Sequence, residues 1–106
     1  MLRLPTCLTG SAEFINPNTD RLVEMSIRAG AAGFIAPGNN PAEIARIRKM
    51  SPGRIIMTPG VGAQGGKAGD AIRAGADLVI VGRSVYTSSD PVEQVDNLNM
   101  EIDSSV

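Results

Sequence analysis

The sequence contains no histidine and a single cysteine, Cys7. Without histidine the chain lacks the imidazole general base, the Ser-His and Cys-His nucleophile pairs and the commonest zinc ligand. A single cysteine excludes an intrachain disulfide and is typical of a reducing compartment. We interpret Cys7 as a small buried hydrophobic residue, because no base is available to activate its thiol. We therefore expect neither a metal site nor a catalytic nucleophile.

Other absences exclude whole classes of partner. Ten Lys+Arg against eleven Asp+Glu give a net charge of -1, without the basic excess of a nucleic-acid-binding protein. The longest apolar stretch, residues 76–81, is interrupted by Asp77 and is far too short to cross a membrane. The first residues show no long apolar segment of a signal peptide. We expect a cytoplasmic chain that binds neither nucleic acid nor membrane.

What the sequence does have is a repeated strand-plus-helix pattern. Its 106 residues are 42% apolar and 20% charged, which is enough for one domain, residues 1–106, with its own core. Four aliphatic runs, each followed by a turn and a helical pattern, occupy residues 2–8, 32–36, 54–58 and 77–82. The last three are apolar on both faces, as in parallel strands covered on both sides. The predicted order is βαβαβαβα.

The ends of the helices carry recognisable signals. Asn40-Pro41-Ala42-Glu43 and Asp90-Pro91-Val92-Glu93 each offer a capping side chain, a proline at the first helical position and a glutamate three residues after the cap. Asn16-Pro17 opens the first helix, which Gly30 closes. A short third helix covers roughly residues 67–74.

Two helices show apolar stripes that we expect to be buried. The stripe of the first helix contains Leu22, Met25 and Ala29. The stripe of the last helix contains Val92, Val95, Leu98 and Ile102. Both stripes predict helices that pack against a sheet.

Alternating strands and helices imply a parallel α/β sheet with right-handed crossovers. Either an open doubly wound sheet or a (β/α)8 barrel of the TIM type fits this pattern. A full barrel needs about 250 residues and eight units, so four units would form half a barrel. Such a half leaves two sheet edges and one apolar face uncovered, with residues such as Ile35, Ile56 and Val79 on or near that face in one of two registers. We therefore expect a homo-oligomer, in the simplest case a dimer.

The most informative segment is a glycine-rich loop, Thr58-Pro59-Gly60-Val61-Gly62-Ala63-Gln64-Gly65-Gly66, between a strand run and a helix. Glycines let a backbone approach an anion closely, and the helix N-terminus behind them presents unpaired N–H groups. The next run ends in Val81-Gly82-Arg83-Ser84, where an arginine can hold phosphate through its planar fork. Because the last two loops of a barrel often form its phosphate site, this pair predicts one.

Plainer interpretations stay open. A glycine-rich loop between strand and helix is often only a tight connection, and an arginine after a strand is often a solvated or salt-bridged surface residue. Two nucleotide-binding motifs are excluded by spacing: the loop is not a dinucleotide GxGxxG fingerprint, and Gly66-Lys67 is followed by Ala68 rather than by the Ser or Thr of a Walker A loop.

The segments Pro59–Gly66 and Val81–Tyr86 together closely resemble the C-terminal signature of the orotidine 5'-phosphate decarboxylase family, particularly its archaeal branch. The resemblance extends to residues 10–15 and to the Pro37-Gly38-Asn39-Asn40-Pro41 loop, and so spans nearly the whole chain. It implies a (β/α)8 barrel, usually dimeric, that converts orotidine 5'-phosphate (OMP) to UMP and CO2 without a cofactor. The chain would correspond to the C-terminal half.

The resemblance also implies roles for individual residues. The ligand phosphate would be held by Gln64, Gly82 and Arg83. The base and ribose would lie near Pro59, Gly60 and Val61. The ligand would be a nucleoside 5'-monophosphate (OMP or UMP) or another phosphate compound.

Two departures from the family pattern bear on activity. The family's alternating Asp and Lys array belongs to its N-terminal half, and no Asp-x-Lys-x-x-Asp spacing occurs here. Lys49 and Lys67 are the only lysines, and we expect Asp70 and Asp77 to be structural. In addition, Cys7-Leu8-Thr9-Gly10 stands where the family has Ser-His-Pro-Gly, which affects recognition of the base. We therefore expect no catalytic residues and no turnover by the chain alone.

Two alternative functions stay open. The chain could be a non-catalytic half barrel that binds phosphate. It could also belong to another phosphate-binding barrel enzyme, such as a sugar-phosphate lyase or isomerase, although such an enzyme would need acids and bases that this chain lacks.

Overall fold

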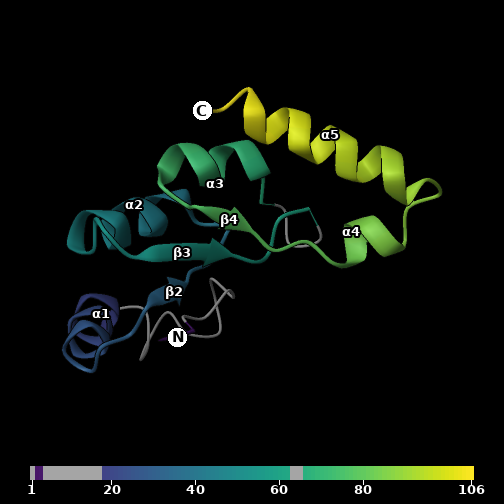
Figure 1. Cartoon of the computed structure of the whole chain (residues 1–106). Coiled ribbons are helices and arrows are strands. Elements are labelled where there is room, and N and C mark those ends of the chain that lie inside the picture. Colours follow the sequence, from purple (N-terminus) through teal and green to yellow (C-terminus); the bar gives the residue numbers. More distant parts are fainter. Residues whose placement is uncertain (1, 4–17, 63–65) are drawn as a thin grey trace.

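The computed structural model describes residues 2–3, 18–62 and 66–106 (Figure 1). Helices and strands alternate through these residues as the sequence predicts, with one additional short helix near the C-terminus. In chain order the elements are β1 (Leu2–Arg3), α1 (Thr19–Arg28), β2 (Gly33–Ile35), α2 (Pro41–Met50), β3 (Ile55–Thr58), α3 (Ala68–Ala74), β4 (Leu78–Val79), α4 (Arg83–Tyr86) and α5 (Pro91–Asp103). Cys7 and the predicted helix start at Asn16-Pro17 lie outside the described residues.

The strands of the described residues form one parallel sheet in the order β1-β2-β3-β4. An open doubly wound sheet reverses its strand order at some point, whereas here each strand lies beside the next one in the sequence. Right-handed crossovers that always step in the same direction leave the helices on one face of the sheet. Neighbouring helices also touch in chain order, α1 with α2, α2 with α3 and α3 with α5. This arrangement is the wall of a barrel.

Two predicted helix caps are present as expected. The Asn40 side chain accepts a hydrogen bond from the Glu43 N–H at 3.3 Å, and the Asp90 side chain accepts one from the Glu93 N–H at 3.1 Å. Gly30 follows the end of α1 with a φ of 81°, a left-handed conformation that favours glycine. Local sequence therefore determines where these helices begin and end.

The hydrophobic core lies between the sheet and the helices. Phe34 of β2 and Ile56 of β3 are adjacent in register and have no exposed surface. They pack in one cluster with residues of α1, α2 and α3, among them Val23, Ile44, Ile47 and Ala71. One face of the sheet is thus fully covered.

None of the described helices covers the opposite face of the sheet, which we call the inner face. Register places Ile35, Met57 and Leu78 on this face. Leu78 is 52% exposed and Ile80, two residues further on, is 43% exposed. Ile35 was correctly predicted here, but Ile56 was not, because a shift of one residue along a strand moves a side chain to the other face. Val79 was wrong for the same reason, since it pairs with the buried Thr58.

The predicted stripe of α1 is correct for Leu22, which packs against the core, and wrong for its other two residues. Met25 is 58% exposed and Ala29 is exposed, whereas Thr19 and Val23 are buried. Ser26 is half-buried on this face because its hydroxyl donates a hydrogen bond to the Leu22 carbonyl at 2.8 Å. The buried side of α1 thus includes a threonine and a serine that the predicted stripe did not contain.

Helix α5 is held to α3 by polar contacts. The Gly69 N–H donates to the Glu101 carboxylate at 2.9 Å, and the Arg73 guanidinium donates to the Ser105 hydroxyl at 3.0 Å. Of the predicted stripe, Leu98 and Ile102 are half-buried, while Val92 and Val95 are exposed. The stripe prediction for α5 is therefore correct only toward its C-terminal end.

Candidate functional site

A pocket of about 330 Å³ lies at the C-terminal ends of β3 and β4. It is lined by Pro59, Gly60, Val61, Ile80, Gly82, Arg83 and Tyr86. The carboxyl ends of parallel strands are where barrels place their functional loops. The pocket brings five of the six sequence-predicted site residues together, and the sixth, Gln64, lies outside the described residues.

The loop after β3 closes on itself through its own backbone. The Gly62 N–H donates to the Gly66 carbonyl at 2.8 Å, and the Gly66 N–H donates to the Gly60 carbonyl at 3.2 Å. Gly60 and Gly62 have φ values of 89° and 76°, which a residue with a Cβ adopts only with strain. The glycines therefore fix the loop's path as well as leaving room beside it.

The loop after β2 supports the loop after β3. The Gly38 N–H donates to the Pro59 carbonyl at 2.8 Å. A Cβ on Gly66 would lie 2.7 Å from the Gly38 carbonyl oxygen and 2.8 Å from that of Gly60, so only glycine fits there. Sequence reasoning assigned no role to Gly38 or Gly66, although both belong to segments that carry the family resemblance.

Arg83 begins α4, a helix that the sequence pattern did not predict. Gly82 precedes it, and the Gly82 carbonyl accepts hydrogen bonds from the N–H groups of Val85 and Tyr86 at 2.9 and 3.1 Å. The Arg83 side chain lines the pocket and is exposed. Within the described part of the chain, its guanidinium has neither a hydrogen-bond partner nor an ion pair. A planar cation with five N–H donors is thus available to a ligand.

Three other arginines, Arg46, Arg48 and Arg73, form ion pairs, whereas Arg21, Arg28 and Arg54, like Arg83, form none within the described residues. Arg46 pairs with Asp20 at 2.7 Å and with Glu43 at 3.2 Å, and the hydrogen bond to Asp20 raises the pKa of Arg46 above its ordinary value. Arg73 pairs with Asp70 at 2.6 Å. Arg83 is therefore not a salt-bridged surface residue within the described part of the chain, while its exposure fits both a solvated side chain and a ligand-binding one.

Tyr86 is a pocket residue that sequence reasoning missed as a site candidate. It is 69% exposed, and its ring lies 3.8 Å from the position that a Cβ on Gly82 would occupy. Its ring and hydroxyl offer a stacking surface and a hydrogen-bond donor beside Arg83. The available signal was its place in the Val81–Tyr86 segment.

Ser84 ties α4 to the glycine loop by close packing. A Cβ on Gly62 would lie 3.1 Å from both Cβ and Oγ of Ser84. The Ser84 hydroxyl oxygen is buried and, among the described residues, has no hydrogen-bond partner. The two loops of the pocket are thus in direct contact as well as adjacent in the barrel wall.

The acids that we expected to be structural lie away from the pocket. Asp77, just before β4, pairs with Arg48 at 2.5 Å and accepts a hydrogen bond from the Ile56 N–H at 2.8 Å. Asp70 pairs with Arg73 on α3. Neither Lys49 nor Lys67 lines the pocket, and the described residues contain no cluster of three or more metal-ligating side chains. The prediction for both aspartates is confirmed.

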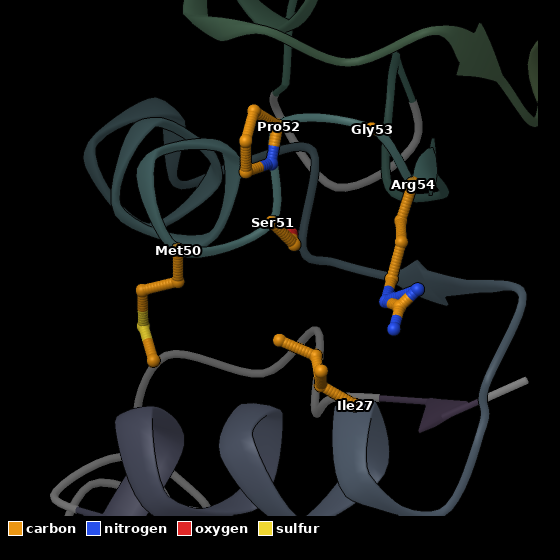
Figure 2. A pocket seen from close by; sticks show the side chains of 6 residues that line it. All are labelled: Ile27, Met50, Ser51, Pro52, Gly53 and Arg54. Carbon is orange, nitrogen blue, oxygen red and sulfur yellow. The ribbon is translucent and has the colours of Figure 1, made fainter.

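A second cavity, of about 300 Å³, opens at the other end of the sheet, just before β3 (Figure 2). The side chains of Ile27, Met50 and Arg54 border it together with Ser51, Pro52 and Gly53. A third, between α1 and α2, is lined by Asp20, Arg46, Lys49 and Met50. Neither contains a sequence-predicted site residue, so the pocket after β3 and β4 is the candidate site.

Sequential parallel strands, helices on one face and a glycine-lined pocket at the carboxyl ends define one half of a (β/α)8 barrel. A sequence model of the orotidine 5'-phosphate decarboxylase / HUMPS family matches residues 9–98. The chain belongs to this family, which confirms the resemblance drawn from its loops. No helix in the part of the chain described here is long and apolar enough to cross a membrane.

Individual relatives agree with the family match. The chain is 52% identical over 95 residues to the orotidine 5'-phosphate decarboxylase of Thermoplasma acidophilum, covering 90% of this chain and 44% of that protein. The crystal structure of the orotidine 5'-monophosphate decarboxylase from Metallosphaera sedula has a TM-score of 0.86 at 35% identity, over 98% of this chain and 50% of that one. The enzyme from Pyrococcus horikoshii has a TM-score of 0.82 at 43% identity, over 96% and 50%. The chain spans about half the length of these relatives, so the half-barrel prediction is confirmed.

Proposed function

We propose that the pocket after β3 and β4 binds the 5'-phosphate of a pyrimidine nucleoside monophosphate, OMP or UMP. The relatives named above are OMP decarboxylases, and this chain corresponds to about half of each. The chain would then supply the phosphate-binding half of a decarboxylase site.

One observation carries this proposal: two loops predicted from sequence to share a ligand line one pocket, and the only cation among the lining residues has no protein partner within the described residues. What sets Arg83 apart from the other arginines without a printed partner is its place in the lining of this pocket. An unpaired guanidinium beside glycine backbone is what a phosphate ester needs, because the fork can donate two parallel hydrogen bonds.

In the proposed complex each lining group has a distinct task. Arg83 would donate to the phosphate oxygens, and Gly82 would leave room for the phosphate against the backbone. Pro59, Gly60 and Val61 would lie along the ribose and base. Gln64 would reach the phosphate from the glycine loop. No cofactor has a part in this proposal.

We further propose that these residues alone do not decarboxylate OMP. Decarboxylation leaves a carbanion that must be protonated, a task suited to an ammonium group placed at the reacting carbon. The candidate pocket is lined by no lysine and no carboxylate. Those groups would have to come from the half of the barrel to which this chain does not correspond.

Calorimetric titration with UMP tests the binding proposal, with uridine as the phosphate-free control. Arg83→Ala should weaken UMP binding about 30-fold, because a charge-assisted hydrogen-bond pair contributes roughly 2 kcal/mol. Arg21→Ala, an exposed arginine on α1, is the matched control and should bind UMP as the parent chain does. Equal binding of UMP and uridine, or no effect of Arg83→Ala, would refute the proposal.

The alternative, a half barrel that binds phosphate without recognising the base, is distinguished by adding ribose 5-phosphate to the series. It is favoured by the absence of carboxylates and lysines from the pocket lining. Ribose 5-phosphate that binds as tightly as UMP would support this alternative, whereas tighter binding of UMP would support the nucleotide site.

A further inference from the structure

The inner face of the sheet is an apolar surface that no other element of the described residues covers. It consists of Ile35, Ile55, Met57, Leu78 and Ile80, which alternate with the helix-facing core residues. Ile55, Leu78 and Ile80 are 47%, 52% and 43% exposed. No charged side chain is among these five. Contiguous apolar surface of this kind on a sheet marks a place that another element covers.

Within the described residues the sheet also has two edges, β1 on one side and β4 on the other, that pair with no further strand. An open edge presents unpaired N–H and C=O groups, and these pair readily with another strand. A partner that covers the inner face and also supplies a strand beside each edge would satisfy both features at once.

We propose that a second copy of this chain covers the inner face, so that two half barrels close into one eight-stranded barrel. The chain superposes on half of a solved barrel, at a TM-score of 0.86 over 50% of that chain. Its arc therefore has the curvature of half a closed barrel, and a second arc of the same size would complete that barrel.

The symmetry of the proposed dimer follows from the strand directions. A two-fold rotation about the barrel axis moves one half into the vacant half and keeps every strand pointing the same way. It places β4 of each copy beside β1 of the other as a parallel pair, the pairing already used throughout this sheet. A two-fold axis perpendicular to the strands would make the pairs at both joins antiparallel. Closed two-fold symmetry also leaves no open edge.

The dimer would also affect the candidate site, an extension that rests on the proposed function. Ile80 belongs both to the inner face and to the lining of the pocket. A partner that covers the inner face would therefore lie against one wall of each pocket. UMP binding would then strengthen as the protein concentration rises through the dimerisation range.

Sedimentation velocity of the whole chain over a range of micromolar concentrations tests the dimer without any ligand. We expect a species of twice the chain mass. Leu78→Glu should raise the dimer dissociation constant about 100-fold or more, because each of two copies loses a buried side chain and gains a carboxylate in an apolar interior. Met25→Glu, on the outer side of α1 and 58% exposed, is the matched control and should dimerise like the parent chain.

Two further variants keep the test decisive. If Leu78→Glu fails to fold by circular dichroism, Ile55→Glu probes the same face at the opposite end of the sheet, with the same expected loss. Val92→Glu probes the exposed stripe of α5, where Val92 is 72% exposed. A monomeric parent chain, or a dimer lost with Val92→Glu and retained in the folded inner-face variant, would overturn the proposal.

Sedimentation tests the dimer, and UMP titration tests the nucleotide site, so one proposal can be refuted while the other is supported. A dimer that does not bind UMP would leave the inner-face pairing supported and refute the nucleotide site. A monomer that binds UMP would do the reverse. UMP affinity that stays constant across the dimerisation range would refute the link between the dimer and the pocket.

Discussion

The two ends of the sheet use arginine in opposite ways. At the end where β3 and β4 begin, Arg48 pairs with Asp77 and donates to the carbonyls of Gly75 and Arg54 at 2.9 and 2.8 Å. At the end where they finish, Arg83 lines a pocket and has no partner among the described residues. The end with Arg48 is stabilised by an ion pair and hydrogen bonds, whereas the end with Arg83 presents an unpaired cation to a ligand. This division is the general rule for barrels, in which one end stabilises the fold and the other carries function.

The largest effect that we expect comes from removing Arg48, the paired arginine at the end of the sheet where β3 and β4 begin. Arg48→Ala removes hydrogen bonds to several backbone carbonyls and leaves Asp77 without its cation. The free energy of unfolding should fall by about 3 kcal/mol, measured by urea denaturation. Arg46→Ala, which removes only exposed ion pairs, should cost well under about 1 kcal/mol. Equal losses in the two variants would contradict the comparison.

The next largest effect should come from adding a side chain at Gly66, where the loops after β2 and β3 approach each other. Gly66→Ala places a Cβ against the carbonyl oxygens of Gly38 and Gly60 and forces the two loops apart. UMP binding should weaken about 5- to 30-fold, consistent with roughly 1–2 kcal/mol of overpacking. Gly53→Ala is the matched control, because a Cβ there meets nothing within 4 Å. Unchanged calorimetric affinity in Gly66→Ala would show that the loop contact does not shape the site.

A smaller and more selective effect should follow from changing the type of cation at the pocket. Arg83→Lys keeps the charge and loses the planar fork, so UMP affinity should fall about tenfold while the urea midpoint stays the same. The same change at Arg48 should lower the urea midpoint, since an ammonium cannot reach the carbonyls that the guanidinium holds. A destabilised Arg83→Lys chain would mean that Arg83, too, is a structural residue.

The smallest effect that we expect concerns the hydroxyl of Thr58. Thr58, at the end of β3, is fully buried, and its hydroxyl oxygen has no hydrogen-bond partner among the described residues. Thr58→Val keeps the shape and removes the unsatisfied group, so unfolding should become harder by about 0.5–1 kcal/mol. Destabilisation, again read by urea denaturation, would indicate that the hydroxyl is satisfied in solution.

Local chemistry made much of the fold predictable. The caps at Asn40 and Asp90 depend on neighbouring residues, and both are found as predicted. The face on which Ile56 lies depends on which strand pairs with which, and sequence alone does not fix that register. The buried side of α1 includes Thr19, whose burial depends on its packing in the folded chain. Predictions therefore succeeded where the cause was local and failed where it was tertiary.

The candidate site shows the same limit. Pro59 and Arg83 were named from their loops, and the fold brings both loops to one pocket. Gly38 and Gly66 were missed because their role is a backbone approach between two loops that are far apart in the sequence. Tyr86 was missed because its position depends on α4, a helix of a single turn, which is too short to show a hydrophobic periodicity.

The sequential order of the strands has a consequence for how the chain folds. Each strand pairs with the next one in the sequence, and each helix packs on its chain neighbours. Loop closures between partners are therefore short, which favours rapid folding and lets structure grow from one strand–helix unit to the next, as in a repeat protein. Such an array opens most easily where it has a neighbour on one side only. Backbone amides of α5, a helix without a fully buried residue, should exchange with deuterium well before those of α2, which buries Ile44 and Ile47.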